Sequence, residues 1–347
     1  MKNFKTRLLF IALSVLLLPI HSQNVTLPRV SQSATVSQRL GLSDVTISYH
    51  SPSVQGRKVF GGIVPYGSVW RAGANENTTI TFTHDAKVEG QAVPAGVYGL
   101  YMLPSEGSVK VLLSKYSKSW GSIAPAEQDL VLNVTVTPVE IPFQEWLSFD
   151  FVDRGANSLT AALQWETTRI PFKIEFDIKN VVVDNMRAEL KGPAGFGWRG
   201  HMQAANYCLQ NNINLDEAMT WIDQSIASSK GFSNLVVKAG LLAKKGQVAE
   251  SEKVMEEAIP TGNGYQLNNY GYQLLGQGKT KKAIEVFKLN VERNQNHQFI
   301  WGFTDSLAEA YLKDGDKKKA LKYYKEARTK APQNQHAYLD GVIAGIK

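Results

Sequence analysis

The period of the hydrophobic pattern changes once along this 347-residue chain, and that change constrains the fold more than any other feature. Between residues 34 and 178, apolar and polar residues alternate with a period of two, which is typical of strands that bury one face. After residue 200 the period becomes that of an amphipathic helix. The sequence therefore predicts an α+β protein with two segregated modules, a β module of residues 24–178 and a helical module of residues 201–347.

The β module contains ten short strand-like segments that are rich in Val, Ile, Thr, Tyr and Phe and bounded by Gly, Pro, Asp or Ser. No helical period interrupts them, which argues against a parallel βαβ sheet. We therefore predict an antiparallel β-sandwich. The segments are residues 34–41, 45–50, 78–84, 86–90, 96–103, 108–114, 130–139, 145–153, 159–166 and 172–178.

Four ordered blocks in this module carry a family resemblance: GRK-x-F-G-G from Gly56, V-P-Y-G from Val64, W-R-x-G-A-N from Trp70, and P-A-G-x-Y-G-L from Pro94. On these blocks, the region from about Pro28 to Asp177 resembles the bacterial exported family called domain of unknown function 2911. The resemblance implies an exported β domain, and it implies no particular activity.

The helical module contains four similar units, each with a small residue five positions after a turn. These anchor residues are spaced by 33, 32 and 37 residues, and each follows a second amphipathic helix pattern. The pattern resembles the tetratricopeptide repeat, a helical hairpin that recurs about every 34 residues. We therefore predict a tetratricopeptide-like solenoid. The anchors are Ala218, Ser251, Ala283 and Ala320.

Residues 179–200 join the two modules, and the sequence predicts a linker there. The segment GFGWRG, Gly195 to Gly200, matches the formal G-x-G-x-x-G pattern. Dinucleotide binding also needs a strand directly before the glycines and a βαβ unit around them, and neither pattern is present. We expect no nucleotide site and no cofactor.

The N-terminus has the pattern of a secretory leader. Lys2, Lys5 and Arg7 precede a thirteen-residue apolar run that is too short to span a bilayer. We predict a signal peptide of residues 1–23, with an uncleaved anchor as the alternative, and no transmembrane span once it is removed. The protein is then expected in the periplasm or cell envelope, or secreted, where it would meet no nucleic acid.

Charge and cysteine content narrow the function classes further. Residues 24–178 carry 12 basic and 14 acidic side chains, whereas residues 179–347 carry 23 and 17, so the helical module has a net charge of +6. Cys208 is the single cysteine, which excludes an intramolecular disulfide and a cysteine-based metal cluster. Its apolar neighbours predict a buried helix position.

The long connection between the strand segments 45–50 and 78–84 is the first candidate binding site. Long ordered loops on a rigid β scaffold often bind ligands, and this one offers aromatic faces and charged groups suited to a carbohydrate or an anion. The alternative is structural: Trp70 would cover the end of the sandwich, and Arg71 and Glu76 would pair beneath the loop. The candidate ligand residues are Arg57, Lys58, Tyr66, Trp70, Arg71, Asn75 and Glu76.

Catalytic residues are few. His50, Glu76 and His84 are the candidates for acid–base chemistry, because both histidines lie at the ends of strands that flank the loop and are expected to approach the same end of the sandwich. No ligand spacing predicts a metal site.

The helical module is the second candidate site, since stacked hairpins expose a continuous face that binds extended peptides or partner helices. A spacer without such a groove is the alternative. Positions on the first helix of each hairpin are expected to line the face. The candidate partner-binding residues are Asn206, Lys238, Asn268, Asn269, Tyr272 and Asp305.

These patterns favour a non-catalytic envelope scaffold in which the repeats bind a protein partner and the sandwich binds a ligand or surface. The alternative is a hydrolase that acts on envelope carbohydrate or peptide through residues 50–85. An open pocket that groups His50, Arg71, Glu76 and His84 would favour the hydrolase. A buried Trp70 with an Arg71–Glu76 pair under a closed loop would favour the scaffold.

Overall fold

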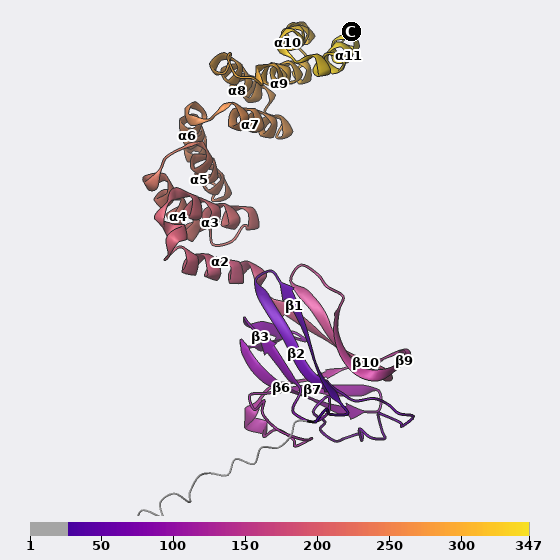
Figure 1. Cartoon of the computed structure of the whole chain (residues 1–347). Coiled ribbons are helices and arrows are strands. Elements are labelled where there is room, and N and C mark those ends of the chain that lie inside the picture. The colour runs from indigo at the N-terminus through magenta and orange to yellow at the C-terminus, as the bar shows by residue number, and fades with distance from the viewer. Residues whose placement is uncertain (1–26, 347) are drawn as a thin grey trace, which may run out of the picture. The chain divides into compact units, whose positions relative to one another are not determined.

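The computed structural model describes residues 27–346, which fall into two compact units, one ending at Ile178 and the other beginning at Lys179 (Figure 1). The predicted signal peptide, residues 1–23, lies outside the described residues. Each unit has its own apolar core.

The N-terminal unit consists of two antiparallel sheets, as the alternating pattern predicts. One sheet has the strand order β1-β2-β3-β6-β7-β8 and the other the order β5-β4-β10-β9. The large apolar side chains of both sheets form one core, which includes the fully buried Phe82, Trp165 and Phe172. The strands are β1 (Gln32–Leu40), β2 (Ser43–Ser51), β3 (Thr79–Phe82), β4 (Ala86–Val88), β5 (Gln91–Val93), β6 (Gly96–Ser105), β7 (Ser108–Ser114), β8 (Leu130–Val136), β9 (Val139–Val152) and β10 (Ser158–Phe176).

The last two strands differ from the prediction. The predicted segments 159–166 and 172–178 belong to one strand, β10, which pairs with β9 over residues 160–169 and with β4 over residues 174–176. Register shifts lie on both sides of Glu166, whose φ of 56° is unusual for a non-glycine residue. Pro171 lies between the two paired stretches, where no ladder hydrogen bond is required of it. In the sequence, the residues around this bulge and Pro171 resemble the end of a strand, which is why the sequence pattern predicts β10 as two segments.

A second difference is the β4–β5 hairpin, of which the sequence analysis identified only the first strand. Val88 pairs with Gln91 across a two-residue turn made by Glu89 and Gly90, with φ values of 48° and 80°. Both values are positive, as a type I′ hairpin turn requires. β5 is only three residues long, too short to show a period of its own.

The C-terminal unit has ten α-helices among the described residues (Figure 1). The hairpins α3–α4, α5–α6, α7–α8 and α9–α10 are the four units that the repeat spacing predicts. The helices are α2 (Ile178–Glu189), α3 (Trp198–Asn211), α4 (Leu215–Ser228), α5 (Phe232–Lys244), α6 (Val248–Ala258), α7 (Gly264–Gly276), α8 (Thr280–Arg293), α9 (Ile300–Lys313), α10 (Lys317–Lys330) and α11 (His336–Gly345).

The anchors and turns of the hairpins have the roles that their residue types suggest. Ala218, Ala283 and Ala320 are fully buried, so a small side chain there lets the paired helices approach closely. Three hairpins turn through a glycine with positive φ: Gly246, Gly278 and Gly315. The first hairpin has no glycine in its turn, and Asn212 and Asn214 take the left-handed conformation instead.

The segment predicted as a linker, residues 179–200, is largely helical. α2 packs on the first hairpin through Val183, which is fully buried in one core with Ala204, Ala205 and Cys208. Its sequence, VVVDNMRAEL, forms a single helix that has no second helix at repeat spacing, so the repeat pattern does not predict it. Cys208 is buried, as predicted.

The glycines of GFGWRG serve chain packing. A Cβ on Gly195 would lie 1.9 Å from the Leu190 carbonyl oxygen, and one on Gly200 would lie 2.1 Å from that of Ala194. A helix, α2, precedes them, so the strand that a dinucleotide site needs is not there. None of the helices in residues 27–346 is long and apolar enough to cross a bilayer.

Candidate functional site

The loop between β2 and β3 is held closed by Trp70, which contradicts the prediction that its ring is free to bind a ligand. Trp70 is only 7% exposed. Its ring stacks on Trp165 at 5.8 Å, and Phe60 packs edge-on at 6.1 Å. The indole N–H donates to the Gly73 carbonyl at 3.0 Å, so the polar edge is also used. Trp70 is a core residue of the sandwich.

Two other predicted ligand residues donate hydrogen bonds to nearby backbone carbonyl groups. The Arg57 guanidinium donates to the carbonyl oxygens of Ser53 at 2.7 Å and Val54 at 2.9 Å. The Asn75 amide donates to the Ser31 carbonyl at 3.1 Å, and Asn75 has a φ of 55°. Lys58 is exposed. Arg57 and Asn75 thus stabilise the loop by bonding to different stretches of backbone.

His50, Arg71 and Glu76 do come together, and Arg29 joins them from the segment before β1. The Glu76 carboxylate accepts from Arg29 at 2.6 Å and lies 3.4 Å from His50 Nε2. These contacts, above all the hydrogen bond from Arg29, lower the pKa of Glu76. The Arg71–Glu76 ion pair expected under the loop is not formed. Arg71 instead donates to the Ser122 hydroxyl at 3.0 Å, and burial lowers its pKa.

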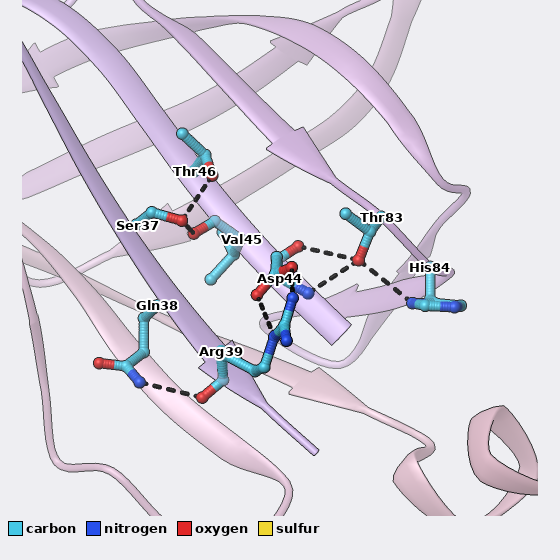
Figure 2. Close-up of polar contacts among 8 residues, drawn as sticks. All are labelled: Ser37, Gln38, Arg39, Asp44, Val45, Thr46, Thr83 and His84. Carbon is cyan, nitrogen blue, oxygen red and sulfur yellow. Dashed lines mark hydrogen bonds and ion pairs between the residues drawn. The ribbon is translucent and has the colours of Figure 1, made fainter. Parts of the chain in front are cut away.

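His84 lies elsewhere, so the expected pairing of the two histidines is wrong. β2 and β3 are antiparallel neighbours, with Ser48 opposite Thr79 and Val45 opposite Phe82. His50, near the C-terminal end of β2, and His84, just after the C-terminal end of β3, therefore lie at opposite ends of the pair, roughly 20 Å apart at 3.3 Å per residue. Figure 2 shows His84 beside Thr83, whose hydroxyl also contacts Asp44, and Asp44 is paired with Arg39. His84 is therefore not part of the group formed by His50, Arg71 and Glu76.

Tyr66 is the predicted ligand residue that faces a cavity. The cavity has a volume of about 240 Å³ and lies between the β6–β7 hairpin and the adjoining parts of β9 and β10. Tyr66 is 42% exposed. Phe60, Glu140, Thr167 and Thr168 are among the other lining residues. Of these groups, Glu140 is the carboxylate, and no histidine or cysteine accompanies it in the lining, so the cavity offers surface for binding and no nucleophile–base pair.

On the helical unit, the structure brings together three of the predicted partner-binding residues. Asn268 and Tyr272 lie on α7, and Asp305 lies on α9, the first helix of the next hairpin. The Tyr272 hydroxyl bridges the two helices by donating to Glu309 Oε2 at 2.8 Å. The Tyr272 ring is supported edge-on by the buried Phe287 at 5.4 Å. We call the residues Asn268, Tyr272, Asp305, Glu309, Tyr324 and Tyr338 the acid–tyrosine face.

The other three predicted partner residues lie apart from this face. Lys238 on α5 is paired with Asp223 at 2.7 Å. Asn206 is partly buried on α3. Asn269 is exposed on α7, but it follows Asn268 directly and therefore points about 100° further round the helix. The face is thus confined to the hairpins that follow α6.

Sequence reasoning missed three members of the face. Glu309 lies four residues after Asp305, and this spacing places both carboxylates on one side of α9. That signal was available in the sequence. Tyr324 on α10 and Tyr338 on α11 had no comparable signal, because α11 was not predicted and the contact across helices depends on how the hairpins stack.

The electrostatics of the face centre on Asp305. Burial, and to a smaller extent the nearby Glu309 carboxylate, raises the pKa of Asp305 to about 6. Burial and the same two carboxylates also raise the pKa of Tyr324 and of Tyr338, so both phenols keep their protons at neutral pH. Two acceptor atoms, Asn268 Oδ1 and Asp305 Oδ1, are buried without a hydrogen-bond partner.

Because the pKa of Asp305 is raised, ionisation of its carboxyl group should destabilise the folded protein at neutral pH. The substitution Asp305→Asn should remove this cost. Because the folded chain binds this proton more tightly than the unfolded chain, the stabilising contribution is complete below about pH 4 and is lost as the pH rises through about 6. Allowing for partial exposure, the variant should be more stable than the wild type by about 1–2 kcal/mol at pH 7.5, and the difference should vanish below pH 4. Urea unfolding at several pH values measures it.

Asp340→Asn is the matched control for this prediction. The Asp340 carboxylate accepts from Arg328 at 2.9 Å, which lowers its pKa, so its removal should not stabilise the protein at pH 7.5. A gain of equal size at pH 4 and pH 7.5 for Asp305→Asn would show that ionisation is not the cause.

A cleft of about 360 Å³ lies between the hairpins α5–α6 and α7–α8. Small residues of α5, such as Ala239 and Gly240, line one side, and Tyr270 and Leu274 of α7 line the other. The apolar cores on either side of it are separate clusters. Among residues 27–346, no three His, Cys, Asp or Glu side chains group as a metal site would require.

Comparison with known proteins gives a family for the N-terminal unit. Residues 31–174 match the model of a family described as protein of unknown function (DUF2911). No curated protein matches the chain.

Solved structures with some similarity include the pilF protein of Pseudomonas aeruginosa, with 14% identity, 45% of this chain and 69% of that chain covered, and a TM-score of 0.32. The MamA protein has 13% identity, covers 46% and 85%, and has a TM-score of 0.32. YrrB, described as a TPR protein with an unusual peptide-binding site, has 14% identity, covers 46% and 81%, and has a TM-score of 0.29. In this chain, four consecutive helical hairpins at repeat spacing carry the repeat assignment, and three of their small anchors, Ala218, Ala283 and Ala320, are fully buried. Residues 31–174 therefore match the DUF2911 family model, and a tetratricopeptide-like helical unit follows them.

Proposed function

We propose that this protein is a non-catalytic partner-binding protein of the cell envelope, in which the helical unit holds a protein segment against the acid–tyrosine face. The observation that carries the proposal is the pair of buried, unpartnered acceptors, Asn268 Oδ1 and Asp305 Oδ1, on the neighbouring first helices α7 and α9. A buried acceptor without a donor costs about 1–3 kcal/mol, and a bound segment would supply the donor.

The stacking of first helices supports this role because it places side chains of successive hairpins on one surface. Tyr272 and Glu309 already connect α7 to α9 across this surface. The Tyr272 ring is 38% exposed and held from beneath by Phe287, so it presents a rigid aromatic side chain to a partner.

For the sandwich, we propose a ligand or surface contact at the cavity beside Tyr66. The hydrolase alternative depended on an open pocket that groups His50, Arg71, Glu76 and His84. His84 follows β3 at the opposite end from His50, and Trp70 is buried beneath the closed loop. The scaffold is therefore the better supported of the two functions.

The test is affinity capture from native envelope extract with the full mature chain as bait. Glu309→Lys changes the face at an exposed position, and Glu250→Lys, on the exposed side of α6, makes the same charge change away from it. We expect at least one protein that the wild type and Glu250→Lys retain and that Glu309→Lys retains at least about tenfold less, the effect of 1.4 kcal/mol. Equal retention by all three baits would contradict the proposed role of the face.

A further inference from the structure

The acid–tyrosine face is a negative region in a basic unit. The helical unit has a net charge of +6, yet Asp305 and Glu309 lie one turn apart on α9. Like charges at this spacing destabilise a helix. Among residues 27–346, no lysine, arginine or histidine forms an ion pair with either carboxylate. Their charge is left uncompensated, although lysines are common in this unit.

The face also has unused hydrogen-bond acceptors. Asn268 Oδ1 and Asp305 Oδ1 each expose less than 1 Å² and accept no hydrogen bond. Glu309 accepts one hydrogen bond, from Tyr272, and has further acceptor capacity. The face therefore offers acceptors from two helices to a group that only donates.

The tyrosines add a surface suited to a cation. Tyr272 and Tyr338 are partly exposed, and the carboxylates of Asp305 and Glu309 lie close enough to Tyr324 and Tyr338 to act on their phenols. A cation gains from carboxylates by charge-assisted hydrogen bonds and from aromatic rings by cation–π attraction. An anion would be repelled, and a purely apolar group would leave the acceptors unpaired.

We infer that the acid–tyrosine face binds the guanidinium of an arginine in the protein segment that the repeats hold. The inference rests on the proposed partner binding and adds the chemistry of one contact. A guanidinium carries five donors in a planar fork, so it can donate to more than one acceptor of the face, whereas the ammonium of lysine has three donors on a compact charge.

The test uses the full mature chain, immobilised, and capped nonapeptide libraries that are random except for a fixed central residue. The fixed residue is arginine, lysine, citrulline, glutamate or leucine. Citrulline matches arginine in shape and lacks its charge. We expect the arginine library to be retained at least about tenfold more than the citrulline library, with lysine between them. Retention of the arginine library should fall as salt is raised.

Asp305→Asn/Glu309→Gln removes both charges while keeping the side-chain shapes, and Glu250→Gln/Glu292→Gln removes two exposed charges elsewhere on the helical unit. The first variant should lose the preference for arginine, and the second should keep it. Circular dichroism confirms that each variant is folded.

Retention of the arginine library no greater than that of the citrulline library, including no retention of either, would overturn the inference. A preference for arginine that persists in Asp305→Asn/Glu309→Gln would also overturn it. If envelope capture depends on Glu309 while the libraries show no preference for arginine, partner binding stands and the arginine contact fails. If capture is unaffected by Glu309→Lys, partner binding itself fails.

Discussion

Replacing Trp70 by alanine is expected to lower the free energy of unfolding of the β-sandwich by about 3–5 kcal/mol. The substitution removes a side chain that is 93% buried, leaves the face of Trp165 uncovered and deprives the Gly73 carbonyl of its donor. The space left by the Trp70 side chain would lie in the core, where this loop packs against Trp165 of β10. Denaturant unfolding followed by tryptophan fluorescence measures the loss.

The control is Tyr66→Ala in the same loop. Tyr66 is 42% exposed, so its truncation should change the free energy of unfolding by less than about 1 kcal/mol. Trp70→Phe keeps an aromatic ring and should fall between the two, which keeps the comparison possible if Trp70→Ala does not fold. Similar stability for Trp70→Ala and the wild type would mean that Trp70 is available for binding and that the closed loop is wrong.

Phe287→Ala is expected to destabilise the helical unit by about 3–5 kcal/mol and to weaken partner capture at temperatures where the variant is still folded. Phe287 is fully buried on α8, supports the Tyr272 ring, and lies so close to α7 that a Cβ on Gly271 would be 2.4 Å from its ring. Its loss removes both the packing between these helices and the support of Tyr272. Thermal unfolding at 222 nm measures the first effect.

Val248→Ala is the matched control, because Val248 on α6 is 60% exposed and its truncation should have little effect. Gly271→Val tests the same contact in the opposite direction, since overpacking typically costs about 1–3 kcal/mol. If Phe287→Ala weakened capture no more than Val248→Ala does, partner binding would not depend on the support of the Tyr272 ring by Phe287. That result would contradict the proposed role of this packing.

The candidate sites show how far residue types alone can lead. Arg57, Trp70 and Asn75 have side chains of types that bind ligands, but the same types also serve to hold a long loop on a sheet, and that is what they do here. Asn268, Tyr272 and Asp305 are candidates because they lie on the first helices of successive hairpins, and the structure brings Tyr272 of α7 close to Asp305 of α9. Asn206, Lys238 and Asn269 also lie on first helices but apart from this face, so stacking, rather than position within a repeat alone, decides which side chains share a surface.

By itself, the sequence determined the local geometry of this protein: the period of two, the helical period, the small anchors at Ala218, Ala283 and Ala320 and the turns at glycine. These features depend on neighbours within a few residues, so they can be read along the chain. The tertiary structure decided which distant groups meet. The stack of Trp70 on Trp165, the separation of His50 from His84 and the approach of Tyr324 to Asp305 all depend on strand order or on the stacking of helices. Contacts between residues far apart in the chain are set by the packing of whole elements, and the period of a segment carries no information about its partner.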